Sequence, residues 1–123
     1  MSRVVALHHV QITVPRGAEA DARRFFCGEL GLREIPKPDV LAVRGGFWLE
    51  LGAVQIHVGT EDEVDRRRTK AHLALEVDDI AGVRARIEAL GLEVHEGEPV
   101  RGLARFECRD PFGNRLEFVQ RTS

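Results

Sequence analysis

Three histidines and one glutamate stand where short strands would present them on a polar face. His9, His57, His72 and Glu117 alternate with apolar neighbours, and successive side chains of a strand point to opposite faces. Imidazole nitrogens and a carboxylate suit one divalent metal ion, which could be Zn, Ni, Mn, Co or Fe. His9, His72 and Glu117 form a minimum set that leaves positions open for substrate or water, and His57 would be a fourth ligand. The alternative is that each is an ordinary surface or core residue.

The elements that must position these side chains follow from hydrophobic spacing. Period-two alternation and the turn-forming residues 110–114 predict short strands and a C-terminal hairpin. The predicted strands are residues 7–14, 32–35, 40–44, 47–51, 54–58, 71–77, 92–95, 103–108 and 116–119. Apolar residues at spacings of three and four predict helices at 18–30 and 80–90, ended by Gly31 and Gly91.

A repeated module relates the two halves of the chain. The helix-ending glycine follows His9 by 22 residues and His72 by 19, and the next candidate ligand, His57 or Glu117, follows by 48 and 45. Both intervals differ by three residues, so a three-residue insertion brings two β-α-β-β-β modules into register. We therefore predict that His9 matches His72 and that His57 matches Glu117. If the modules pack about a pseudo-twofold axis, the four side chains can converge.

Length and composition indicate an ordinary globular α+β protein. A chain of 123 residues can bury a core as one domain, made of module 1 (about 5–59), a linker (about 60–70) and module 2 (about 71–121). With 43% hydrophobic residues, 31% charged residues and a net charge of −2, neither nucleic acid nor a membrane is an expected partner. Without a signal peptide pattern we expect a cytoplasmic location, where Cys27 and Cys108 would be reduced, packed thiols.

Three motifs carry a resemblance to a known family. These are His-Val-Gln-Ile-Thr-Val at 9–14, His-Leu-Ala-Leu-Glu-Val at 72–77 and Asp-Pro-Phe-Gly-Asn-Arg-Leu-Glu at 110–117. Together with the repeat, they resemble the vicinal oxygen chelate superfamily, over nearly the whole chain. That superfamily includes glyoxalase I, fosfomycin-resistance thiol transferases, extradiol dioxygenases, methylmalonyl-CoA epimerase and the metal-free bleomycin-resistance proteins.

The resemblance implies a fold, a cofactor and an assembly. The fold would be two tandem β-α-β-β-β modules that form a curved mixed sheet around a cleft, the glyoxalase-like fold. One divalent metal would be held at His9, His72 and Glu117, with the position of His57 varying between subfamilies. Homodimers are usual among small members, and a site can combine modules from one chain or from two. In a glyoxalase-like isomerisation, Glu117 would leave the metal and shuttle a proton.

Strand parity indicates which other residues lie beside the predicted metal site. Gln11, Thr13, Trp48 and Arg105 share the ligand side, and we expect them to bind substrate. The Trp48 indole could stack on a planar group, and the Arg105 guanidinium could hold an anionic group. The alternatives are rim packing for Trp48 and surface ion pairing of Arg105 with Glu107 or Glu50.

Two functions follow from these patterns. The first is a metal-dependent enzyme that chelates a small oxygen-rich substrate and stabilises an enolate-like intermediate, of isomerase or lyase type or dioxygenase-like. The second is a metal-free protein that sequesters a small molecule, as the bleomycin-resistance type does. Two differences from glyoxalase I make its reaction a weaker expectation for this chain. Glyoxalase I usually has Glu at the position of His57 and an Arg near the position of Thr13. Extradiol dioxygenases generally carry an acid-base Tyr, a residue type that this chain lacks.

Overall fold

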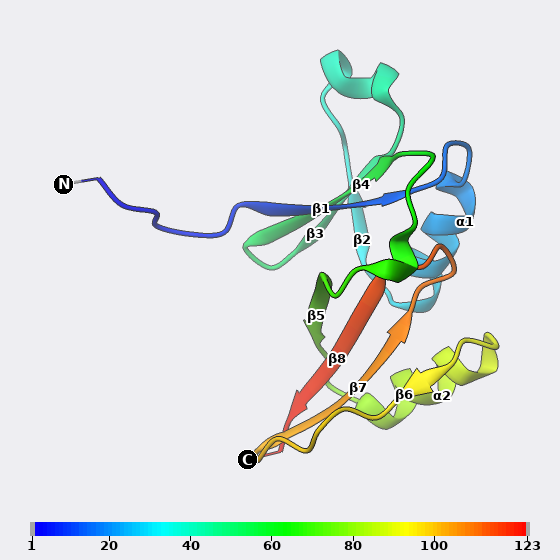
Figure 1. The fold of residues 1–123 in the computed structure, drawn as a ribbon. Helices are drawn as coiled ribbons and strands as arrows, with labels where there is room; N and C mark the ends of the chain where they lie inside the picture. The colour runs from blue at the N-terminus through cyan, green and yellow to red at the C-terminus, as the bar shows by residue number, and fades with distance from the viewer. Residues whose placement is uncertain (1, 123) are drawn as a thin grey trace. The chain divides into compact units, whose positions relative to one another are not determined.

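The computed structural model describes residues 2–122 and divides them into two compact units. Unit 1 extends to Glu63 and unit 2 begins at Val64. Each unit contains its own four-stranded mixed sheet and a helical segment (Figure 1). None of the helices in this range has the length and apolarity that a membrane span requires.

Unit 1 is built on the strand order β1-β4-β3-β2, with β1 and β4 parallel and the other pairs antiparallel. Its elements are β1 (His9–Val14), α1 (Glu19–Arg23), the π-helical segment η1 (Arg24–Glu29), β2 (Arg33–Ile35), the 3-10 segment η2 (Asp39–Arg44), β3 (Phe47–Leu51) and β4 (Val54–Thr60). The buried apolar side chains of the helical segment and of the sheet, among them Phe26 and Phe47, form the core of this unit. The guanidinium of Arg23 lies over the Phe47 ring, 4.7 Å from its centroid.

Unit 2 repeats this arrangement with the strand order β5-β8-β7-β6. Its elements are the 3-10 turn η3 (Arg66–Arg68), β5 (His72–Glu76), α2 (Ile80–Ala89), β6 (Val94–His95), β7 (Leu103–Arg109) and β8 (Arg115–Arg121). The core of this unit includes Ile87 of α2 and the stacked rings of Phe106 and Phe118. The predicted fold, two tandem β-α-β-β-β modules with mixed sheets, is therefore confirmed.

The strand register confirms the residue correspondence that the sequence spacing predicted. In unit 1 the parallel pairing sets Gln11, two residues after His9, opposite His57. In unit 2 it sets Ala74, two residues after His72, opposite Glu117. His9 and His72 therefore occupy equivalent positions, as do His57 and Glu117.

Both helical segments end in the way that the glycine positions predicted. Gly31 and Gly91 have φ values of +75° and +81°, the left-handed conformation that favours glycine. The following amides complete the helix ends, since Leu32 N donates to Phe26 O and Leu92 N donates to Ile87 O. The two cysteines are free thiols, as expected, with Cys108 buried and Cys27 half-buried.

One predicted strand is wrong. Residues 40–44 form the 3-10 segment η2 instead, which stands in the connection between β2 and β3 (Figure 1). Both edges of β3 are already paired, with β2 and with β4, so no edge of β3 is left for this segment. Its valines point to solvent, with Val40 80% and Val43 91% exposed. Alternation alone could not show this, because a strand also needs a partner.

Candidate functional site

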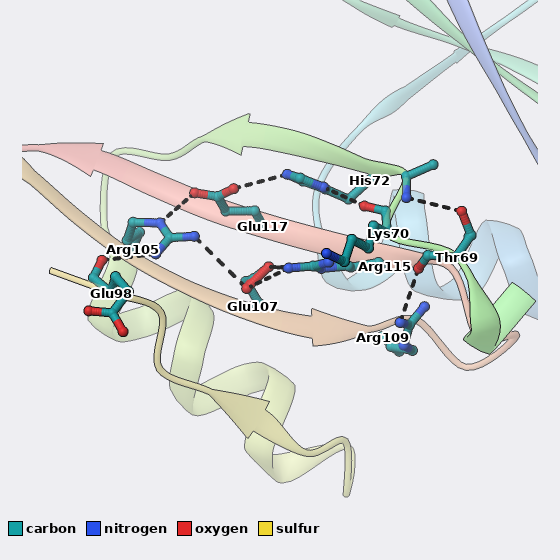
Figure 2. A network of polar contacts seen from close by, with 10 residues as sticks. Thr69, Lys70, His72, Glu98, Arg105, Glu107, Arg109, Arg115 and Glu117 are labelled. Atoms are coloured by element: carbon teal, nitrogen blue, oxygen red, sulfur yellow. Dashed lines mark hydrogen bonds and ion pairs between the residues drawn. The ribbon is translucent and has the colours of Figure 1, made fainter. Parts of the chain in front are cut away.

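In unit 2 an imidazole and a carboxylate direct their donor atoms at one another. His72, at the start of β5, places Nε2 3.1 Å from Oε1 of Glu117, which lies in the parallel strand β8 (Figure 2). The opposite ring nitrogen, Nδ1, donates to the carbonyl oxygen of Lys70 at 2.9 Å. That bond fixes the ring orientation, because a carbonyl can only accept. Nε2, at the other edge of the ring, then faces Oε1 of Glu117.

The spacing of these two atoms fits a shared metal ion. Bonds of about 2.1 Å to nitrogen and to oxygen place the two donor atoms about 3.0 Å apart at a right angle and about 3.4 Å apart at the tetrahedral angle. The observed 3.1 Å lies within this range. The carbonyl on Nδ1 is also a usual partner of a metal-binding imidazole. The pair supplies two ligands, and within residues 2–122 no group of three or more His, Cys, Asp or Glu side chains is gathered for a metal.

Arg105 of β7 holds the other oxygen of the same carboxylate. Its Nε donates to Oε2 of Glu117 at 2.7 Å, and its Nη1 donates to the carbonyl oxygen of Glu98 at 3.0 Å (Figure 2). The hydrogen bond to Oε2 is the main cause that lowers the pKa of Glu117, and the His72 contact acts in the same direction. The carboxylate is therefore held in its charged form, which makes it a better ligand and a weaker base.

A second ion pair continues across the same hairpin. Arg115 donates through Nε to Oε1 of Glu107 at 2.8 Å and through Nη2 to Oε2 at 3.0 Å. Nη2 of Arg105 lies 3.9 Å from Oε2 of Glu107, which joins the two pairs into one row (Figure 2). Because the Glu107 and Glu117 side chains are only 14% and 12% exposed, each carboxylate needs its arginine.

The equivalent positions of unit 1 carry stacked rings. His57 lies between Trp48 and His9, with ring centroids at 3.9 Å and 4.0 Å and interplanar angles of 2° and 16°. Nε2 of His57 donates to Oε1 of Gln55 at 2.9 Å, and Nδ1 of His9 lies 2.8 Å from Nδ1 of His8. Burial is the main cause that lowers the pKa of His57, and the neighbouring positive groups add to it. These surroundings therefore favour the neutral form of the ring.

This stacking decides which unit 1 histidines can share an ion. A metal lies in the plane of the imidazole that binds it, about 2.1 Å from the nitrogen. The planes of His9 and His57 are nearly parallel, at 16° to one another, and the ring centroids are 4.0 Å apart. No point lies in both planes near both nitrogens, so the two rings as placed cannot hold one ion together. A shared ion requires one of the rings to rotate.

A cavity of about 360 Å³ opens beside these rings, within unit 1. Its walls come from three strands and from the connection between β2 and β3. The lining residues are His9, Gln11, Lys37, Leu41, Arg44, Gly45, Trp48, His57, Val58, Gly59 and Thr60. The sequence patterns did not indicate Lys37 and Arg44, because alternation assigned the segment between them to a strand. Their shared signal is spacing, since positions 37, 41 and 44 recur at intervals of four and three residues.

The predicted site residues fall into two groups. Unit 1 brings together His9, His57, Gln11 and Trp48 around the cavity. Unit 2 brings together His72, Glu117 and Arg105. Thr13 does not line the cavity, and its hydroxyl donates to Oε1 of Glu61 at 3.1 Å.

Comparison with known proteins adds to this geometry. The family described as the Glyoxalase/Bleomycin resistance protein/Dioxygenase superfamily matches residues 6–118. A glyoxalase family protein from Bacillus anthracis is 35% identical, with a TM-score of 0.87 over 99% of each chain. FosX, a fosfomycin resistance protein of Listeria monocytogenes solved with Mn(II) and sulfate, is 20% identical, with a TM-score of 0.76 over 98% of this chain and 93% of its own. An integron cassette protein of V. cholerae is 20% identical, with a TM-score of 0.69 over 98% of both chains. No curated protein matches the sequence.

Proposed function

The chain belongs to the glyoxalase/bleomycin resistance protein/dioxygenase superfamily, and on this basis we propose that it is a metal-dependent enzyme. Its substrate would be a small oxygen-rich molecule, and its reaction an isomerisation or elimination, or an oxygenation of the dioxygenase type. The observation that carries the proposal is the 3.1 Å approach of Nε2 of His72 to Oε1 of Glu117, a distance that also fits two ligands of one ion. Mn(II) in a FosX structure is consistent with divalent metal chemistry on this fold.

The proposed ligands are His9, His72 and Glu117. His72 and Glu117 already direct their donor atoms at one another. His57 becomes a fourth ligand only if its ring leaves the stack between Trp48 and His9. A bound divalent ion would act as a Lewis acid and stabilise negative charge on substrate oxygens, as an enolate-like intermediate requires.

The residues around Glu117 favour its role as a ligand. Arg105 keeps Oε2 occupied and the carboxylate charged, while Oε1 stays available beside His72. For Glu117 to act instead as the proton shuttle, Oε2 must first leave the Arg105 guanidinium. Thr13, Gln11 and Trp48 remain proposed substrate contacts, and the last two line a cavity.

Metal content tests this proposal directly. Protein purified without chelator or nickel affinity is analysed by inductively coupled plasma mass spectrometry, together with a His72→Ala, Glu117→Ala double variant. A His95→Ala, Glu76→Ala double variant is the matched control, since both of these side chains are exposed and outside the site. We expect about one divalent ion per chain in the native and control proteins and none in the site variant. Protein that stays metal-free after incubation with Zn, Ni, Mn and Fe(II) would contradict the enzyme proposal.

A second candidate function is metal-free sequestration of a small molecule. The unit 1 cavity favours it, because its histidines are stacked rather than open and no carboxylate of the described residues lines it. Ligand binding that is unchanged by chelator would then accompany the absence of metal. Either function is proposed for a cytoplasmic homodimer, and a solution mass of twice the 13.8 kDa chain tests the assembly.

A further inference from the structure

The cavity of unit 1 has a positively charged wall. Lys37 and Arg44 line it, and none of the described residues that line it is an aspartate or glutamate. The other lining side chains include one indole, two imidazoles and a glutamine amide as the larger polar or aromatic groups. A concave site lined by charge of one sign concentrates ligands of the opposite sign.

Neither cation forms an ion pair among the described residues, although the Glu19 carboxylate lies close to Gly45 of the same wall. None of the ion pairs within residues 2–122 includes Lys37 or Arg44. Nζ of Lys37 donates to the carbonyl oxygen of Gly45, which places the ammonium group without cancelling its charge. The neighbouring carboxylate, Glu19, instead accepts a hydrogen bond from the backbone N–H of Gly46 at 3.2 Å.

The connection between β2 and β3 brings the two cations to one cavity. Lys37 lies just before η2 and Arg44 ends it, while Leu41 and Arg44, three residues apart within η2, fall on one side of its 3-10 turns. Leu41 contributes an apolar surface between the two charges. An extended strand of the same residues would have separated the cations, so the 3-10 conformation is what builds this wall.

We propose that this cavity binds a small anion that carries a carboxylate or phosphoryl group, held by Lys37 and Arg44 beside Trp48. The volume of about 360 Å³ lies in the lower part of the range of small-ligand sites. Charge-assisted hydrogen bonds from an ammonium and a guanidinium are the usual means of holding such groups. A substrate role for this anion rests on the proposed function, whereas its binding to the cavity does not.

The chain provides its own reporter for the test. Trp48 is its single tryptophan and there is no tyrosine, so indole fluorescence reports on this cavity. Chelator-treated protein is titrated with inorganic phosphate and, separately, with acetate, at constant ionic strength, and glycerol is the uncharged comparison. We expect saturable fluorescence changes with phosphate or acetate and none with glycerol, and the stronger of the two anions identifies the preferred group.

Variants then assign the binding to the two cations. Lys37→Gln and Arg44→Gln should each raise the dissociation constant about tenfold, and the double variant should abolish saturation. Arg24→Gln removes one positive charge on the same unit outside the cavity and should leave the constant within about twofold of the native value. Equal weakening by all three variants, or no saturable change in the native protein, would overturn the proposal. Because no metal is present, this outcome is independent of the metal content that tests the enzyme proposal.

Discussion

Unit 1 and unit 2 share one strand order and one register, yet their equivalent side chains do different things. His9 and His57 lie face to face in a ring stack. His72 and Glu117 meet edge on, nitrogen to oxygen. The shared topology therefore sets the backbone position of each side chain, while the neighbouring side chains set the direction of its donor atoms.

One pair of cross-strand neighbours accounts for the difference. Trp48 lies opposite His57 in the antiparallel pairing of unit 1, and Glu107 lies opposite Glu117 in that of unit 2. An indole offers its face to the imidazole, which stacks on it. A carboxylate beside another carboxylate instead requires cations, which Arg105 and Arg115 provide. Unit 2, which has the charged carboxylate at this position, is therefore the unit whose donor atoms are arranged for a metal.

The largest effect on the free energy of unfolding is expected at the hairpin loops, which are built differently in the two units. The β3–β4 loop is the two residues 52 and 53, whereas the β7–β8 loop is organised by the buried Asp110. Oδ1 of Asp110 accepts from the N–H groups of Phe112 at 2.9 Å and Asn114 at 2.8 Å. Asp110→Ala should lower the free energy of unfolding by about 2 kcal/mol, because both amides lose their acceptor.

Urea denaturation measures this effect, and Asp110→Asn is the control. The asparagine amide retains one acceptor oxygen. The decrease in the free energy of unfolding should therefore be less than half of that in the alanine variant. An alanine variant as stable as the native protein would show that the two hairpins do not differ in this way.

An intermediate effect is expected where Arg105 orients Glu117. Arg105→Gln should weaken Mn(II) binding about tenfold, as the loss of a group that supports a metal ligand usually does. Gly97→Ala should act in the same direction without removing charge, because an added Cβ would lie 1.8 Å from Nη1 of Arg105. Gly28→Ala is the matched control, since its Cβ would meet nothing within 4 Å.

Isothermal titration calorimetry with Mn(II) separates two views of this arginine. Tighter binding in both variants would show that Arg105 competes with the ion for the carboxylate, rather than orienting it. Unit 2 would then resemble unit 1, with its ligand engaged elsewhere.

The smallest effect concerns Glu19 of unit 1 and its dependence on pH. The hydrogen bond from Gly46 is the main cause that lowers the pKa of Glu19 below its ordinary value. A lowered carboxyl pKa stabilises the folded protein above the unfolded pKa of about 4.3, and this contribution is lost as the pH falls through the folded pKa. Glu19→Gln should therefore cost less than about 1 kcal/mol at pH 7 and progressively less toward pH 3. Urea midpoints at both pH values measure it, and a cost that grows toward acid would contradict this sign.

Much of the fold could be predicted because its signals are local. Alternation identified the strands that carry His9, His57, His72 and Glu117, and the glycines identified where the helical segments end. Counting residues between these landmarks was enough to pair the two modules. The 3-10 segment η2 was not predicted, because whether an alternating segment pairs as a strand depends on which strand edges remain open.

The candidate site was less predictable because side-chain direction depends on distant neighbours. Strand parity placed His57 and Glu117 on the ligand face, but it could not show that Trp48 would stack on one or that Arg105 would bind the other. Arg105 forms the ion pair that was the alternative to substrate binding, although mainly with Glu117 rather than with Glu107 or Glu50. Lys37 and Arg44 were not predicted to line a cavity, because that depends on the shape of the connection between β2 and β3, part of which alternation assigned to a strand.

His57 and Glu117 occupy equivalent positions but differ in whether they can bind a metal, and one measurement tests this difference directly. Mn(II) affinity is determined by calorimetry for Glu117→Gln and for His57→Gln, two changes at equivalent positions of the two units. We predict that Glu117→Gln weakens binding at least about a hundredfold, because it removes a charged ligand. His57→Gln should change the affinity by less than about threefold, since its ring faces Trp48 and His9. Equal and large losses in both variants would show that the His57 ring leaves its stack to bind the ion, and would contradict the claimed difference between the two units.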